Sequence, residues 1–235
     1  MSLPASGLPR INGRYWAAIT LASIAGANMG DLFAHQFGLG HVNGLPILAA
    51  ALALILWRQA RAPAEAWYWA AILVLRTAAT NLGDLATHDL HLGAGAATAA
   101  LAVPMAGLAW HAARGRTVYE IPAGDTIYWV TMLLAGTLGT VAGDGCADVA
   151  GLLPSSALWL AIWAAGLAFV LSRPRGVLAY WTVVAVVRTL GTNLGDLFAF
   201  RRGLHLGLPL STALTLTALV AALTLSRRHN TAASA

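Results

Sequence analysis

Long apolar runs separated by short polar connections dominate this chain. Four runs begin at a Tyr-Trp dipeptide, and a second apolar run follows each of them. A bilayer core is crossed by about 20 residues of helix, a length that stretches such as 15–37 and 68–90 supply. The pattern predicts an all-α, polytopic membrane protein with eight transmembrane helices.

One two-helix unit occurs four times along the chain. Tyr-Trp begins at residues 15, 68, 128 and 180, and in every copy a Gly-Asp pair places its Asp 15 residues after the Trp. An internal repeat of this kind defines one supersecondary unit. We therefore predict a single membrane domain, 1–235, made of four tandem helical hairpins at 14–62, 66–116, 126–175 and 178–228.

The basic residues predict the orientation of the hairpins. All 14 are Arg, and ten of these lie at the Tyr-Trp end of the repeats, whereas only Arg201 and Arg202 lie at the opposite end. The positive-inside rule then places both termini in the cytoplasm. Because each copy has two helices, all copies insert in the same sense, and a pseudo-twofold or pseudo-fourfold axis along the membrane normal is expected. Trp16, Trp69, Trp129 and Trp181 are expected to anchor the cytoplasmic interface as an aromatic belt.

Composition excludes several classes of protein. The chain is 58% hydrophobic and 10% charged, whereas a soluble domain is about 25% charged. The net charge of +5 does not indicate nucleic-acid binding, because the Arg residues lie mostly in short connections between apolar runs. The absence of Lys excludes a Schiff-base cofactor, and the single Cys146 excludes an internal disulfide.

Two stretches carry a resemblance to a known family. Residues 76–85 read RTAATNLGDL and residues 188–197 read RTLGTNLGDL, with eight of ten positions identical. With the Tyr-Trp motifs and the fourfold count, they resemble the bacterial membrane family built from four tandem DUF347-type two-helix repeats. The resemblance implies a multi-pass protein of the bacterial inner membrane and little about chemistry. A shorter likeness, confined to the Gly-Asp pair, is to cation exporters.

The repeated acidic positions are the candidate metal ligands, and their pattern leaves open whether the four Asp share one site or form two. In three copies a His or Asp follows the repeated Asp by four residues, which places the two side chains on one helix face. Carboxylate and imidazole ligands suit Mn²⁺, Fe²⁺, Co²⁺, Ni²⁺ or Zn²⁺. A Trp-to-Asp spacing of about 22 Å of helix puts the acids in the outer third of the membrane. The predicted ligands are Asp31, His35, Asp84, His88, Asp144, Asp148 and Asp196.

Further polar residues are expected to line a pathway or to support these ligands. They are Asn28, Arg76, Thr80, Asn81, Thr140, Arg188, Thr192, Asn193, His41, His91 and His205. Other interpretations stay open: the Asn and Thr residues as hydrogen bonds between helices, the two Arg as ion-pair partners of Asp on neighbouring helices, and the repeated Gly as sites of close helix approach or of a helix break. Since only copies two and four carry Arg, these copies are expected to face each other.

The favoured function is transport of a divalent metal cation in exchange for protons, with no catalytic residue assigned. The alternatives are a membrane-embedded, metal-dependent hydrolase facing the periplasm, a transporter of a small anion that uses Arg76 and Arg188, and a haem or metal sensor. The expected partners are the lipid bilayer and the metal cation, and no nucleic acid. The oligomeric state is left open.

Overall fold

The computed structural model describes residues 7–114, 125–172, 176–200 and 203–232, and these parts are helical throughout apart from short connections. The α-helices are α1 (Gly13–Asp31), α2 (Gly40–Asn43), α3 (Leu45–Arg61), α4 (Glu65–Asp84), α5 (Ala94–Ala113), α6 (Thr126–Ala150), α7 (Leu152–Ser172), α8 (Val177–Ala199) and α9 (Leu208–Ala232). Two π-helical turns, η1 (Leu32–Gln36) and η2 (Leu85–Asp89), extend α1 and α4. The prediction of an all-α protein is confirmed for the described residues.

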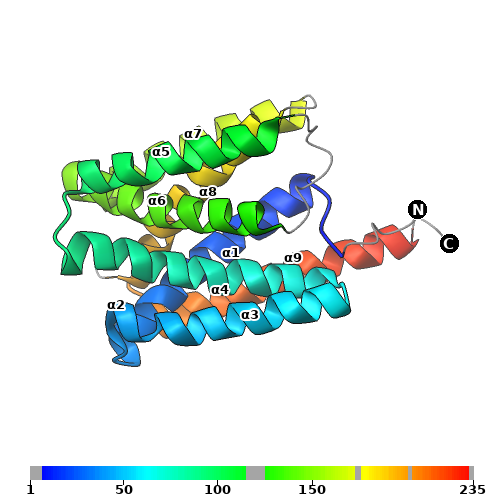
Figure 1. The fold of residues 1–235 in the computed structure, drawn as a ribbon, viewed down its shortest axis with the longest axis horizontal. Helices are drawn as coiled ribbons and strands as arrows, with labels where there is room; N and C mark the ends of the chain where they lie inside the picture. The colour runs from blue at the N-terminus through cyan, green and yellow to red at the C-terminus, as the bar shows by residue number, and fades with distance from the viewer. Residues whose placement is uncertain (1–6, 115–124, 173–175, 201–202, 233–235) are drawn as a thin grey trace.

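The first helices of the four repeats form the centre of the molecule. Each of α1, α4, α6 and α8 contacts the next, and α8 contacts α1, so the four form a closed ring. In Figure 1 they lie between α5 and α7 at the top and α3 at the bottom. In α1, α6 and α8, 61–67% of the most apolar 18-residue window is buried, against 11–28% in the outer helices. The four helices run from the Tyr-Trp pairs at one end of the bundle to the Gly-Asp pairs at the other. This arrangement sets α4 and α8 diagonally across the ring, as copies two and four are expected to be.

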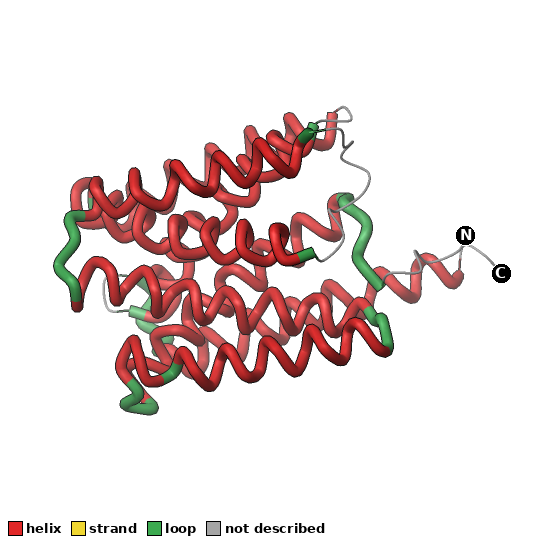
Figure 2. The backbone as a smooth tube through the Cα atoms, viewed as in Figure 1, coloured by secondary structure: helices red, strands yellow, loops and turns green. Residues whose placement is uncertain are grey.

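The second helix of each repeat packs chiefly against the first helix of the following repeat. Helix α3 packs against α4, α5 against α6 and α7 against α8, while α9 packs against α1 and so joins the first and last repeats. Short loops connect the described helices (Figure 2). Every repeat therefore buries part of its surface against a neighbour, and the four cannot be separated without exposing apolar faces.

The glycines of the Gly-Asp pairs let neighbouring inner helices approach closely. A Cβ added to Gly30 would lie 2.6 Å from Thr80 Cβ, and one added to Gly83 would lie 2.8 Å from Thr140 Cγ2. Close approach, which was one of the two interpretations of these glycines, is thus confirmed. The alternative of a helix break is wrong, because α6 and α8 run through the pair and α1 and α4 pass directly into π-helical turns.

The Tyr-Trp pairs lie inside the bundle rather than in an interfacial belt. The hydroxyls of Tyr15, Tyr68, Tyr128 and Tyr180 form a closed ring of hydrogen bonds, with successive O···O distances of 3.1, 2.6, 3.2 and 2.6 Å. The four paired Trp side chains are only 1–8% exposed, and each packs against the Tyr of the preceding repeat. The prediction that Trp16, Trp69, Trp129 and Trp181 anchor an interface is therefore wrong. The tyrosine ring holds all four pairs at the bundle axis.

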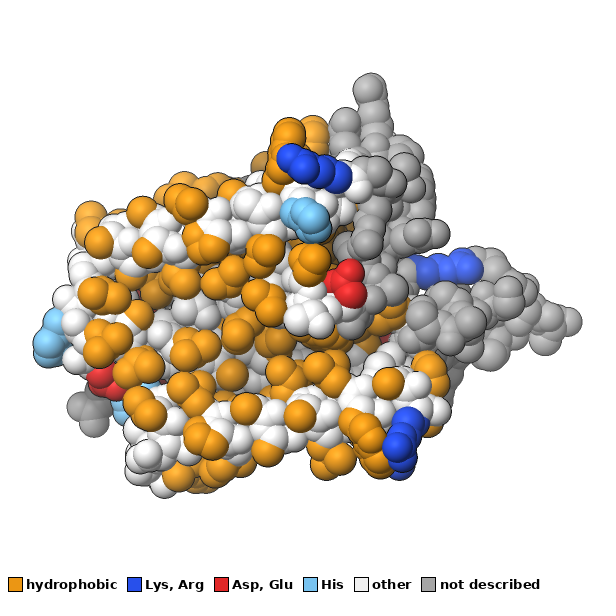
Figure 3. All heavy atoms as spheres, in the orientation of Figure 1, with side chains coloured by type: hydrophobic (Ala, Val, Ile, Leu, Met, Phe, Trp, Pro, Cys, Tyr) orange, Lys and Arg blue, Asp and Glu red, His pale blue; other side chains and the backbone are white. Residues whose placement is uncertain are grey.

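The outer surface is apolar along the length of the helices. Seven described helical segments are long and apolar enough to cross a membrane. Helix α4, with 20 residues, is long enough too but carries Glu65, Arg76 and Asp84. On the visible face, hydrophobic side chains cover the flank, while acidic side chains, His and Arg gather towards the two ends (Figure 3). Such a distribution fits a multi-pass membrane protein.

Candidate functional site

A large cavity opens at the Gly-Asp end of the helix ring. Its volume is about 870 Å³, and the repeated Asp of every copy lines it. The lining residues that the sequence predicted as ligands or pathway residues are Asp31, His35, His41, Asp84, His88, Asp144, Asp148, Asp196 and His205. The structure thus brings together four acids that are spread over 166 positions of the sequence.

Burial separates these side chains into a wall and a rim. Asp84 is 6% exposed, and the other three repeated Asp are half-buried. His35, His88, Asp148 and His205 are exposed, and His41 is half-buried. The carboxylates therefore form the wall of the cavity, while the imidazoles and Asp148 surround its mouth.

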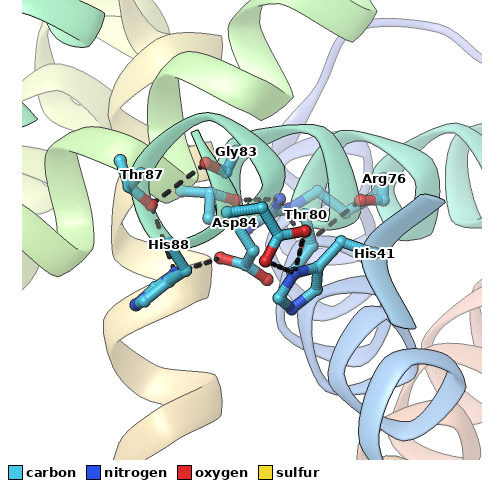
Figure 4. Close-up of polar contacts among 9 residues, drawn as sticks. His41, Arg76, Thr80, Gly83, Asp84, Thr87 and His88 are labelled. Atoms are coloured by element: carbon cyan, nitrogen blue, oxygen red, sulfur yellow. Dashed lines mark hydrogen bonds and ion pairs between the residues drawn. The ribbon is translucent and has the colours of Figure 1, made fainter. Parts of the chain in front are cut away.

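Two of the predicted pairs of Asp with the residue four positions later fall where an α-helix passes into a π-helical turn, η1 or η2. Asp84 Oδ1 and His88 Nδ1 lie 3.9 Å apart, so this predicted pair is in contact, and it is the one Asp–His ion pair of this spacing among the described residues (Figure 4). The i→i+5 hydrogen bonding of a π-helix widens the turn, and such turns are frequent at functional sites. Within the described residues, no group of three or more His, Cys, Asp or Glu has the arrangement of a bound metal ion.

A second contact at the rim involves a residue that the sequence did not single out. Nδ1 of His41, on α2, lies 3.1 Å from Oδ1 and 3.0 Å from Oδ2 of Asp89, on η2. His41 also stacks near two further imidazoles, with ring centroids 5.6 Å from His35 and 6.3 Å from His88. In the sequence Asp89 lies between His88 and His91. This position was the only signal that Asp89 belongs to the site.

Below the cavity, Arg76 fills the bundle axis and is 0% exposed. Its Nη1 donates to Thr80 and Thr140, both at 2.9 Å, and its Nη2 donates to Thr192 at 2.6 Å. Its Nε donates to Ser23 at 3.3 Å. The interpretation that Arg76 forms an ion pair with an Asp of a neighbouring helix is wrong for the described structure, because hydroxyl and carbonyl oxygens take its hydrogen bonds instead.

Arg188 is equally buried but poorly partnered. Its Nη2 lies 3.0 Å from Met132 Sδ, while Nε and Nη1 have no hydrogen-bond partner among the described residues. Arg188 lies eight residues after Tyr180 and eight before Asp196, or about 12 Å of helix from each. The two Arg therefore occupy the middle of the bundle, between the carboxylates and the tyrosine ring.

The predicted Asn residues lie between helices rather than in the cavity wall. Nδ2 of Asn28 donates to Ser211 at 2.5 Å, and Oδ1 of Asn193 accepts from Ser155. Both side-chain polar atoms of Asn81 lack a partner within the described residues. His91 is exposed, with a φ of 53°, and is not among the residues that line the cavity.

A helical bundle with apolar flanks, a polar axis and an acidic cavity at one end fits a multi-pass membrane protein with internal repeats. Residues 14–64 and 179–231 match the family described as Repeat of Unknown Function (DUF347). These two segments are the first and last of the four repeats, so the resemblance to DUF347 repeats is confirmed in these two copies. Neither a curated protein nor a solved structure matches the chain.

Proposed function

We propose that this protein is a multi-pass membrane transporter that exchanges a divalent metal cation for protons, with the acidic cavity as its cation-binding entrance. In this proposal, α4 spans the bilayer with the seven apolar segments, the four repeats are related by a pseudo-fourfold axis along the membrane normal, and both termini lie in the cytoplasm of a bacterium. The cavity then faces the outside of the inner membrane.

The observation that carries the proposal is the convergence of four carboxylates, one from each repeat, on one open cavity. An Asp within a membrane helix costs about 2.5–3.5 kcal/mol on insertion scales. Four carboxylates in one cavity also repel one another. A divalent cation or protons would relieve both costs, so the cavity is suited to hold either.

Exchange follows from the same geometry. When a cation leaves, the carboxylates of Asp31, Asp84, Asp144 and Asp196 need new positive charge nearby, and protons from the outer solution can supply it. Proton binding therefore disfavours the cation and cation binding disfavours the protons, which is the linkage that an exchanger needs.

The far side of the bundle supplies the closed gate. Arg76 crosses the axis directly below the carboxylates, and the four tyrosine hydroxyls close the other end with a ring of hydrogen bonds. We interpret the described conformation as open to the outside and closed to the cytoplasm. Passage of an ion would require both layers to part, as expected for alternating access.

Transport of an anion is less well supported by this geometry. Arg76 is buried, its hydrogen bonds are taken by Thr and Ser hydroxyls, and an anion would have to pass four carboxylates to reach it. The field of an acidic cavity concentrates cations and excludes anions.

Flux into proteoliposomes tests the proposal. Wild-type protein should carry Mn²⁺ into vesicles loaded with a metal-sensitive dye and should move protons in the opposite direction, as reported by a pH-sensitive dye. Asp84→Asn should lower the flux at least tenfold. The matched control is Glu65→Gln, which removes an acid that pairs with Arg14 at the opposite end of the bundle and should leave the flux within twofold. Equal loss in both variants would contradict the proposed role of the cavity.

A further inference from the structure

The histidines at the rim of the cavity are distributed unevenly around it. His35, His41 and His88 come from η1, α2 and η2 of the first two repeats. At the position of His35 and His88, the third repeat has Asp148 and the fourth has Phe200. The clustered imidazoles thus lie on one side of a cavity whose carboxylates come from all four repeats.

The contact between His41 and Asp89 prepares His41 to bind a metal. A carboxylate only accepts hydrogen bonds, so the Nδ1 atom that lies 3.0 Å from Asp89 Oδ2 must carry the proton. Nε2 of the neutral ring then keeps a free electron pair. Metal-binding histidines in proteins almost always donate their other ring N–H to a carboxylate or carbonyl in this way.

His88 is held in a similar manner. Its Nδ1 lies 3.2 Å from Thr87 Oγ1 and 3.9 Å from Asp84 Oδ1. Thr87 and Asp84 therefore both contact Nδ1 and not Nε2 (Figure 4). Its side chain is 64% exposed and can turn without displacing packed groups. Nε2 of His88 is therefore also available to a ligand at the rim.

The distances of His41 from the other two rings are close to those expected on one ion. An imidazole nitrogen lies about 2 Å from a bound Zn²⁺, which sets the centres of two imidazoles on the same ion about 5 to 6 Å apart. The observed centroid distances are 5.6 Å between His35 and His41 and 6.3 Å between His41 and His88. The described rotamers do not form a closed site, and closing it requires the exposed side chains of His35 and His88 to rotate towards His41.

We propose that His35, His41 and His88 bind a first-row divalent transition-metal ion at the rim of the cavity, with Asp89 orienting His41 from behind. The role of this site rests on the proposed function. The three histidines bind a metal ion that favours imidazole ligands, such as Zn²⁺ or Co²⁺, before the ion reaches the carboxylates of the cavity wall. A water molecule completes the coordination, as in open three-histidine sites.

Metal titration of the full chain in lipid nanodiscs tests the site. Co²⁺ is the first probe, because nitrogen ligation changes its visible absorption, and Zn²⁺ is then measured by competition. Wild-type protein should bind Co²⁺ saturably, and His41→Ala and His88→Ala should each weaken binding at least tenfold. Asp89→Asn should weaken it about 10- to 100-fold while the absorption at saturation keeps the wild-type form, as expected of a positioning residue.

A histidine at the same end but outside the cavity provides the control. His91→Ala removes an imidazole that does not line the cavity and should bind Co²⁺ within twofold of wild type. Because His88 is exposed, His88→Ala keeps the fold, and its elution profile and melting temperature verify this. Absence of saturable binding in wild type, unchanged binding in His88→Ala, or equal loss in His91→Ala would overturn the proposal.

The result separates this site from the transport proposal. Binding that is lost in His41→Ala, together with no metal flux in wild type, would retain the site and reject the transporter. Metal flux that depends on Asp84 but is unchanged in His41→Ala and His88→Ala, with no Co²⁺ binding at the rim, would reject the site and retain the transporter.

Discussion

Nη2 of Arg76 donates a 2.6 Å hydrogen bond to the hydroxyl of Thr192, which lies on α8, diagonally across the ring from α4. The same guanidinium reaches Thr140 on α6 and Ser23 on α1. One side chain therefore connects all four inner helices at the level just below the acidic cavity. A planar group with five donors is suited to this task in a way that a lysine ammonium is not.

The two buried Arg should respond differently to replacement by Met. Arg76→Met removes charge-assisted hydrogen bonds to three Thr hydroxyls and should lower the free energy of unfolding by about 2 kcal/mol. Arg188→Met removes a buried charge with two unpartnered nitrogens and should be neutral or stabilising. Thermal unfolding of both variants in the same detergent measures the difference.

Each of the two Arg variants serves as the control for the other, because the two positions are equivalent. Arg76 and Arg188 each lie eight residues after the Tyr and eight residues before the Asp of their own repeat. The account of the polar axis would be contradicted if Arg188→Met were the more destabilising change.

The tyrosine ring should show non-additive energetics. Tyr68→Phe removes one hydroxyl and leaves the buried hydroxyls of Tyr15 and Tyr128 each short of a partner, at a cost of about 1–3 kcal/mol. In the double variant with Tyr128→Phe, the 2.6 Å pair is removed as a unit. The double change should therefore cost clearly less than the sum of the two single changes. A double-mutant cycle of unfolding free energies checks this, and strict additivity would argue against a connected ring.

Close helix packing should make a small substitution costly at Gly139 in α6. A Cβ there would lie 2.5 Å from Arg188 Cβ and 2.6 Å from the Arg188 carbonyl carbon. Because the backbone of α8 must move, Gly139→Ala should destabilise the protein by about 1–3 kcal/mol.

The matched control is Gly107→Ala in α5, where an added Cβ meets nothing within 4 Å. There the higher helix propensity of Ala should stabilise the protein by up to about 1 kcal/mol. Melting temperatures of the two variants should therefore move in opposite directions, and a shift of the same sign in both would contradict the packing described for the ring.

The helices could be predicted from the sequence, because a long apolar run has few alternatives to a helix. The convergence of the four Asp could be predicted too, because the constant Trp-to-Asp spacing places each Asp at the same level of its helix. The placement of Trp16 and its counterparts could not. An aromatic pair near a basic loop fits a membrane interface and a buried ring equally well. Contacts between repeats, such as the one between Tyr15 and Tyr180, 165 positions apart, distinguish the two.

Contacts between repeats account for most of what the sequence left out. Apart from Thr80 on the same helix, the side-chain partners of Arg76 lie on three other helices, so no spacing within one repeat could predict them. The hydrogen bond between His41 and Asp89 depends on the short helix α2 and on a π-helical turn, and neither of these has a strong pattern in the sequence. The i,i+4 spacing within one helix did predict that Asp84 and His88 lie together, and the structure places them 3.9 Å apart.

Anomalous scattering from protein saturated with Mn²⁺ tests the central claim most directly, because it locates the ion without relying on transport. The account predicts an Mn²⁺ peak inside the cavity, among the carboxylates of Asp31, Asp84, Asp144 and Asp196, that disappears in the variant with all four changed to Asn. A wild-type structure with no peak among these carboxylates, or a peak that persists in the fourfold Asn variant, would contradict it.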